Sequence, residues 1–237
     1  MCGRYTLATP DPADIRARFP VGETVEIRRR FNVAPGDEVL AVTTDKESRP
    51  RGDLLRWGLV PSWSDAPESR LKMINARVET VTERPAFRHA FGRFRCLIIA
   101  DGFYEWQKLS DPRDGRRGVA KHAYHITRAD GEPFAFAGLW SIWRDADTKL
   151  RSCAILTSAA NDTVSLLHDR MPVILERGAE DAWLDPSTPR AQLLEMLAPL
   201  PPSLTALRPV GPSVNDARYD GPECLAPAGE RAQATLF

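Results

Sequence analysis

Cys2 lies directly after the initiator methionine in the opening stretch MCGRYT, an unusual place for a reactive side chain. Methionine aminopeptidase removes Met1 when the second residue is small, so the mature chain would begin with a thiol and a free α-amine on adjacent carbons. The amine is partly neutral near physiological pH, and the thiol is a strong nucleophile even when little of it is ionised. Such a 1,2-aminothiol suits acyl transfer, or capture of an aldehyde as an imine that the thiol closes to a thiazolidine ring. The alternative is an accidental cysteine on a frayed end.

Three polar residues elsewhere in the chain could assist this nucleophile. Glu105, in the segment GFYEW, follows an apolar run; desolvation by its aromatic neighbours would raise its pKa and suit it to acid–base catalysis, unless it is a solvated carboxylate at a strand edge. Asn75 could orient a substrate oxygen, or simply cap the helix expected after it. His168 lies between a short helix and an apolar strand, where a proton shuttle fits, although a lone histidine is more often structural. His89, His122 and His125 have no feature that singles them out.

Arginine and tryptophan side chains could supply contacts to nucleic acid. Arg4 and Arg77 could hold phosphates, because a guanidinium binds them in fork geometry. Trp57 and Trp63 flank a turn that contains Gly and Pro, and could stack on unpaired bases, although core filling is the more usual role of tryptophan. A polar segment at 111–121 could extend a basic groove or be a solvated loop; its basic residues are Arg113, Arg116, Arg117 and Lys121.

Charge and composition limit the classes of function. The 237 residues include 32 Lys and Arg and 32 Asp and Glu, so the zero net charge argues against coating of nucleic acid by bulk attraction and leaves room for a local basic cleft. No apolar run is long enough to span a bilayer, and no signal-peptide pattern opens the chain, so we expect a cytoplasmic protein without membrane contact.

The four cysteines are widely scattered, with no CxxC pair and no histidine at ligand spacing. We therefore expect no metal site and no cofactor. Cys96 and Cys153 lie inside apolar, strand-like runs and are expected to be reduced, buried side chains.

Strand-like runs outnumber helical segments and do not alternate with them regularly. This pattern predicts an α+β fold, a single domain built on a mostly antiparallel sheet or open β-barrel with peripheral helices. The domain is expected to span 1–220, followed by a flexible tail at 221–237. Helices are expected within 10–19, within 75–91 with an interruption near Pro85, within 160–169 and within 187–197, the last capped by Ser187 or Thr188.

Seven sequence blocks occur in the order and rough spacing of one known family. They are MCGRYTL, FNVAPGDEV, RWGLVPSW, INARVET, GFYEW, HDRMPVIL and RPVGPSVND, which together extend over nearly the whole chain. The chain resembles the SOS response-associated peptidase (SRAP) family, whose members crosslink to abasic sites in DNA. The resemblance implies a single α+β domain that acts, with no cofactor and as a monomer, on single-stranded DNA containing abasic sites.

The resemblance also implies a role for each candidate residue. The amine and thiol of Cys2 would form the thiazolidine with the abasic aldehyde, Asn75 would position the opened sugar and Glu105 would shuttle protons. His168 would assist at the same sugar and could help to reverse the crosslink. The flanking phosphates would be held by Arg4, Arg77 and Arg170, and bases would stack on Trp57 and nearby loop residues. The family name adds a peptidase activity, which Cys2 could serve by removing its own leader.

Two other classes of function remain open on the residues alone. A cysteine N-terminal-nucleophile hydrolase would turn over peptides or amides, whereas a crosslinker stays attached to its substrate. A non-catalytic single-strand binding module would bind DNA equally well after Cys2→Ala and would form no species resistant to denaturation.

Overall fold

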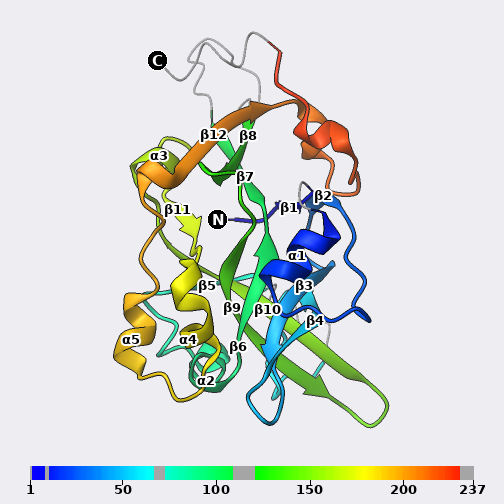
Figure 1. Ribbon diagram of the computed structural model, residues 1–237, viewed down its shortest axis with the longest axis vertical. Helices are drawn as coiled ribbons and strands as arrows, with labels where there is room; N and C mark the ends of the chain where they lie inside the picture. The colour runs from blue at the N-terminus through cyan, green and yellow to red at the C-terminus, as the bar shows by residue number, and fades with distance from the viewer. Residues whose placement is uncertain (1, 9–10, 67–72, 109–120, 230–237) are drawn as a thin grey trace.

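Two β-sheets form the framework of the protein. The computed structural model describes residues 2–8, 11–66, 73–108 and 121–229. One sheet has five strands (Figure 1), whose spatial order is β12 (Thr205–Val210), β8 (Lys121–Arg128), β7 (Gly102–Lys108), β1 (Tyr5–Leu7) and β2 (Arg30–Val33). All of its pairings are antiparallel, so β1 near the amino terminus is an interior strand with β7 on one side and β2 on the other.

The second sheet closes on itself. Its strands run in the order β10 (Lys149–Ala159), β4 (Pro50–Trp57), β3 (Glu38–Thr44), β6 (Arg95–Ala100) and β9 (Phe134–Arg144), and β9 pairs with β10 again. The expected α+β fold with mostly antiparallel strands is confirmed, and the expected barrel is closed. The parallel neighbours of β10 are β4 and the short β5 (Asn75–Arg77), while β11 (Arg170–Pro172) pairs with it antiparallel.

Short helices lie outside the two sheets (Figure 1). They are α1 (Pro12–Arg18), α2 (Pro85–Arg93), α3 (Asp162–Ser165), α4 (Glu180–Leu184) and α5 (Arg190–Glu195), with 3-10 turns η1 (Arg177–Ala179), η2 (Pro202–Leu204), η3 (Pro212–Asn215) and η4 (Pro222–Leu225). The side chain of Asp11 accepts a hydrogen bond from the backbone N–H of Ala13 and caps α1. Within the described ranges, no helix is long and apolar enough to cross a membrane.

Two helix predictions were wrong in detail. Asn75 does not begin a helix, because Asn75–Arg77 pairs with β10 as a strand and the helix begins only at Pro85, a residue suited to a first turn. Neither Ser187 nor Thr188 caps α5; the cap position is Pro189, with no side-chain hydrogen bond.

Strand β6 of the barrel is buried on both faces. Along β6, Leu97 and Ile99 belong to one hydrophobic cluster, whereas Cys96 and Ile98 belong to another, as the alternation of side chains in a strand requires. Cys96 and Cys153 are both fully buried free thiols, as expected from their apolar surroundings in the sequence.

The carboxyl-terminal boundary expected at residue 220 was wrong for the part of 221–237 that the structure describes. Cys224 in η4 is fully buried against a cluster that includes Tyr104 and Val210, and the backbone N–H of Gly211 donates to the carbonyl of Ala226 at 2.9 Å. Residues 221–229 therefore belong to the domain, and 230–237 lie outside the described residues.

A pair of glycine substitutions tests the packing between β9 and β6. A Cβ atom added at Gly138 would lie 2.7 Å from Cys96 Sγ, whereas one added at Gly92 in α2 has nothing within 4 Å. We expect Gly138→Ala to lower the free energy of unfolding by about 1–3 kcal/mol. Gly92→Ala should be neutral or stabilise by up to about 1 kcal/mol, because alanine favours helix. Urea denaturation measures both; equal stabilities for the two variants would contradict the packing described.

Candidate functional site

Cys2 lies inside the molecule, at the start of the chain segment that becomes β1. Figure 1 shows the chain beginning near the middle of the molecule, between β11 and β7. The Cys2 side chain is fully buried, and its Sγ lies 3.8 Å from the carbonyl oxygen of Arg4. The same carbonyl accepts a hydrogen bond from the backbone N–H of Tyr104 at 3.0 Å, which ties this segment to β7. The frayed-end alternative for Cys2 is therefore excluded.

Asn75 holds the backbone of Cys2. β5 pairs in parallel with β10, with Asn75 opposite Ile155, and the Asn75 Nδ2 donates to the carbonyl oxygen of Cys2 at 2.8 Å. The Asn75 Oδ1 is buried and has no hydrogen-bond partner among the described residues. A buried amide oxygen of this kind is costly unless something donates to it, so it is placed to accept a hydrogen bond from a bound molecule or from the amine of Cys2.

Glu105 brings a carboxyl group to the same place from β7. Glu105 is 4% exposed, and burial raises the pKa of its carboxyl above the usual value. Burial also raises the pKa of the Cys2 thiol far above its usual value, and the charge of Glu105 raises it further, so the two groups are close enough to interact. The alternative of a solvated strand-edge carboxylate is excluded, and burial disfavours the charged forms of both the carboxyl and the thiol.

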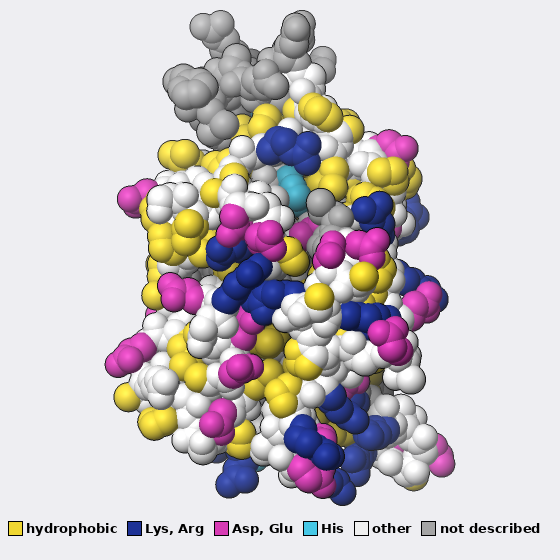
Figure 2. Space-filling model, in the orientation of Figure 1, with side chains coloured by type: hydrophobic (Ala, Val, Ile, Leu, Met, Phe, Trp, Pro, Cys, Tyr) yellow, Lys and Arg dark blue, Asp and Glu magenta, His cyan; other side chains and the backbone are white. Residues whose placement is uncertain are grey.

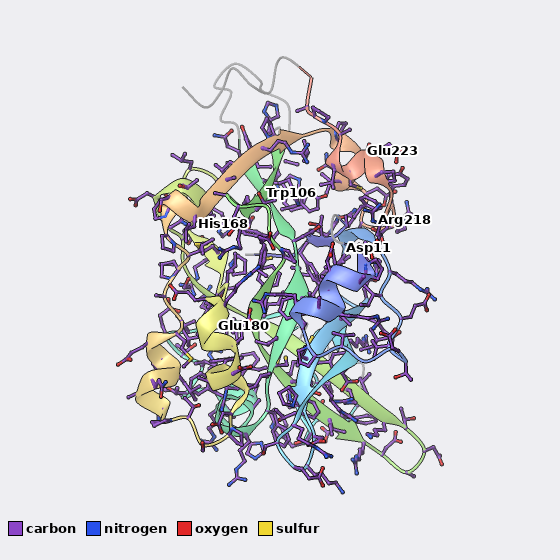
Figure 3. The ribbon with its side chains drawn as sticks, in the orientation of Figure 1. Asp11, Trp106, His168, Glu180, Arg218 and Glu223 are labelled. Atoms are coloured by element: carbon purple, nitrogen blue, oxygen red, sulfur yellow. The ribbon has the colours of Figure 1, made fainter. Side chains whose placement is uncertain are left out.

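His168 lies in the connection between α3 and β11 and is labelled in Figure 3. Its Nδ1 lies 3.0 Å from the backbone N–H of Arg170 and 2.7 Å from a carboxylate oxygen of Asp169. The nitrogen can accept from Arg170 only when it carries no proton, and can donate to Asp169 only when it does. The charge of Asp169 also raises the pKa of Glu105, so this connection faces the cluster around Cys2.

The side chain of Arg4 contacts other residues of the protein. Its Nη1 donates to Asn32 Oδ1 and to the carbonyl of Val214, both at 2.8 Å, and its guanidinium lies 5.9 Å from the centroid of a Trp106 ring. Trp106, labelled in Figure 3, in turn donates to the side-chain oxygen of Asn215 at 2.8 Å. The arginine therefore anchors the amino-terminal segment, and its contact with phosphate stays a prediction.

Arg77 and Arg170 lie on either side of β10. Arg77 is exposed and lies two residues after Asn75, so both side chains leave the same face of β5. Arg170 forms a two-pronged ion pair with Glu79, at 2.5 and 3.0 Å, and also donates to the carbonyl of Thr157. Glu79 was missed by the sequence analysis, although it belongs to the INARVET block. A phosphate would have to compete with this carboxylate for Arg170.

The two tryptophans of the RWGLVPSW block have different environments. Trp57 is 1% exposed and its indole N–H donates to the carbonyl of Ile74 at 2.9 Å, so the prediction that it stacks on a base was wrong. Trp63 is 63% exposed, and its contact with DNA stays a prediction. Of the basic segment at 111–121, only Lys121 lies within the described residues, where it is exposed at the start of β8.

The described surface is not dominated by one charge. On the face shown in Figure 2, basic and acidic side chains are interspersed, in agreement with the zero net charge. Among the residues that the structure describes, no cluster of three or more His, Cys, Asp or Glu side chains could hold a metal ion.

Comparisons with known proteins identify relatives along the whole described domain. The sequence pattern of the SOS response-associated peptidase (SRAP) family matches residues 1–217. The abasic site processing protein YoaM of Bacillus subtilis is 39% identical over 83% of this chain and 85% of its own length. The abasic site processing protein YedK of Escherichia coli is 30% identical over 84% of each chain. A crystal structure of a Bacteroides thetaiotaomicron protein has a TM-score of 0.82 at 22% identity, covering 96% of this chain and 100% of its own, which supports the fold.

The burial of Glu105 predicts a dependence of stability on pH. Because the folded protein raises the pKa of this carboxyl, the unfolded chain loses the proton first, and ionisation favours unfolding above the unfolded pKa of about 4.3. Below that pH the effect is absent. We therefore expect Glu105→Gln to gain stability relative to the unsubstituted protein as the pH rises from about 4 to about 8.

Thermal denaturation across this pH range measures the effect. Glu195→Gln is the matched control for the removal of a carboxyl group, since Glu195 is exposed at the end of α5. A stability difference between Glu105→Gln and the unsubstituted protein that stays constant with pH would contradict the raised pKa.

Proposed function

The chain belongs to the SOS response-associated peptidase family, and from that premise we propose that it recognises abasic sites in single-stranded DNA and bonds to them through Cys2 after removal of Met1. The names of its relatives, abasic site processing proteins, support the choice of lesion. One observation carries the chemistry: the amide of Asn75 holds the backbone of a buried Cys2 beside the buried carboxyl of Glu105.

The proposed bond formation balances with the loss of one water. In its ring-opened form, an abasic deoxyribose carries an aldehyde at C1′. The α-amine of mature Cys2 adds to this carbon, and the resulting hydroxyl leaves as water to give an imine. The thiol then loses its proton to a base, and its sulfur bonds to the same carbon of the protonated imine, whose nitrogen keeps its own hydrogen; this closes the thiazolidine. The second step joins groups on one residue, so proximity favours it strongly.

Glu105 is suited to move both protons. Its raised pKa supports a protonated carboxyl that gives its proton to the departing hydroxyl. The carboxylate formed in that step is then the base for the thiol of Cys2, whose own pKa is raised by burial and by the charge of Glu105. One carboxyl thus serves as acid and base in turn, and it ends the reaction with its proton restored.

The residues around this cluster are proposed to bind the rest of the lesion. The unpartnered Oδ1 of Asn75 would accept a hydrogen bond from a hydroxyl of the opened sugar. Arg77, exposed on the same face of β5, would contact the adjacent phosphate, and Trp63 would stack on a base. His168, with its two alternative partners for Nδ1, would carry protons at the same sugar and assist reversal. Arg4 and Arg170 would contribute positive charge to the path of the strand.

We further propose a cytoplasmic protein that acts as a monomer without a cofactor. The alternative is that Cys2 serves a peptidase activity, which the name of the family contains. The two activities differ in outcome, because a peptidase turns over whereas the crosslinker stays bound to its lesion.

A denaturing gel tests the proposed function. Protein shown by intact mass to begin at Cys2 is incubated with a single-stranded oligonucleotide that carries one abasic site. We expect a heat-stable shifted band, absent with undamaged DNA. Cys2→Ala keeps an α-amine and lacks the thiol, so it should give a band only when borohydride reduces the imine. Cys224→Ala is the matched control, because Cys224 is equally buried but lies in η4.

Two outcomes of the denaturing gel would contradict the proposed function. No band from protein that begins at Cys2, with or without borohydride, would exclude covalent capture, and hydrolysis of peptides would then be the activity to assay. A band of undiminished heat stability from Cys2→Ala would exclude the thiazolidine.

Substitution of Asn75 tests the positioning of Cys2. Asn75→Ala removes the donor to the Cys2 carbonyl, and a small misplacement of a reacting group can cost up to about 100-fold in rate. Asn75→Asp should be similarly slow, because a carboxylate and a carbonyl both accept and repel one another. Single-turnover crosslinking rates measure the effect. An Asn75→Ala variant that reacts at the original rate would remove Asn75 from the site.

A further inference from the structure

A buried hydroxyl group joins β1 to two other chain segments. Thr6 is fully buried, and its Oγ1 lies 2.5 Å from Asp101 Oδ1 and 3.0 Å from His125 Nε2. A hydroxyl has one hydrogen, and a carboxylate oxygen can only accept. Thr6 therefore donates to Asp101, and it accepts from His125, which must carry its hydrogen on Nε2.

Asp101 makes three hydrogen bonds to β1 and to the residue that follows it. Besides the hydroxyl of Thr6, its second carboxylate oxygen accepts from the backbone N–H of Ala8 at 2.9 Å, and its own backbone N–H donates to the carbonyl of Thr6 at 2.9 Å. Asp101 lies in the connection between β6 and β7 and is 5% exposed. Because water has little access to these bonds, the loss of one partner would leave a buried polar group unsatisfied, which is costly.

His125 reaches Thr6 across an intervening strand. It lies on β8, and β7 separates β8 from β1 in the sheet. The imidazole passes over Gly102, where an added Cβ atom would lie 2.1 Å from His125 Nε2, so only a residue without a side chain leaves room for it. Burial lowers the pKa of His125, which keeps the ring neutral and leaves it the single N–H that the network uses.

The network connects β1, the strand that follows Cys2, to the segment that leads into β7, the strand that carries Glu105. Thr6 lies four residues after Cys2, and Asp101 lies four residues before Glu105. We propose that Thr6, Asp101 and His125 are positioning residues, which set the register of β1 against β7 and so place Cys2 against Glu105. This inference rests on the proposed function, since the alignment matters only if Cys2 and Glu105 react together. The three residues act through the strands and are not catalytic.

Removal of one hydroxyl tests this role. Thr6→Val keeps the shape and the β-branching and loses the hydrogen bonds, whereas Thr6→Ser keeps a hydroxyl. Thr43→Val is the matched control, because Thr43 is also fully buried and its hydroxyl donates to Asp53 at 3.1 Å, but it lies on β3 of the barrel. Single-turnover crosslinking to abasic single-stranded DNA is measured over a range of DNA concentrations, for each variant shown by circular dichroism to be folded.

We expect Thr6→Val to lower the maximal crosslinking rate by about 10- to 100-fold, with little change in the DNA concentration that gives half of that rate. Thr6→Ser should restore most of the rate. Thr43→Val should react like the unsubstituted protein, even where it loses similar stability. A rate loss specific to Thr6→Val separates positioning from general stabilisation.

Several results would overturn the inference. A folded Thr6→Val that reacts at the original rate, or a Thr43→Val that slows equally, would overturn it while leaving the proposed function intact. If Thr6→Val does not fold, His125→Phe is measured in its place. This variant keeps a ring beside Tyr104, where the two ring centroids now lie 5.1 Å apart, and removes the N–H that donates to Thr6. An unchanged crosslinking rate in His125→Phe would overturn the inference. Absence of crosslinking by the unsubstituted protein would overturn both proposals.

Discussion

The position of Cys2 depends on β1, a strand of three residues that pairs with a neighbouring strand on each side. A strand this short has few hydrogen bonds of its own, and chain ends fray unless they are tied down. Here β1 pairs with β7 and β2, and Arg4 just before it bonds to Asn32 on β2 and to the carbonyl of Val214 near the carboxyl terminus. The guanidinium thus joins the beginning, the first third and the end of the described chain. Without these bonds the buried start of the chain would be free to leave the core, and the reactive cluster would have no fixed geometry.

Burial of this cluster has an electrostatic consequence that shapes the proposed chemistry. Desolvation disfavours the thiolate of Cys2 and the carboxylate of Glu105, and each charge would also disfavour the other. Burial thus favours the protonated forms of both groups, and the thiol becomes a nucleophile only when it gives up its proton. A carboxyl that first gives a proton and then takes one suits that arrangement better than a permanently ionised base would. The same burial keeps bulk water from the imine, which protects an intermediate that water would otherwise hydrolyse.

Local features of the sequence predicted much of the framework. The apolar runs around Cys96 and Cys153 predicted buried strands, and the turn and cap residues before α1 predicted a helix at the place where it forms. The predictions failed where a distant segment overrode local preference. Asn75 looks like a helix cap in its own segment, but pairing with β10 makes it part of a strand. For Trp57 the base stacking implied by the family resemblance was wrong, and the alternative of core filling holds, because the side chain is buried and donates to the carbonyl of Ile74.

The sequence by itself determined the kind of chemistry that we propose, because removal of Met1 would leave an amine and a thiol on one terminal residue, which form an aminothiol in any fold. It also carried the ordered blocks that identify the family, since these are properties of residue type and spacing. The tertiary structure decided which groups meet. Asn75 reaches the carbonyl of Cys2, Arg170 is paired with Glu79, and His125, which no sequence feature singled out, reaches Thr6 across β7. Hydrogen bonding and desolvation depend on distances through space and on exclusion of water, and neither can be inferred from the separation of residues along the chain.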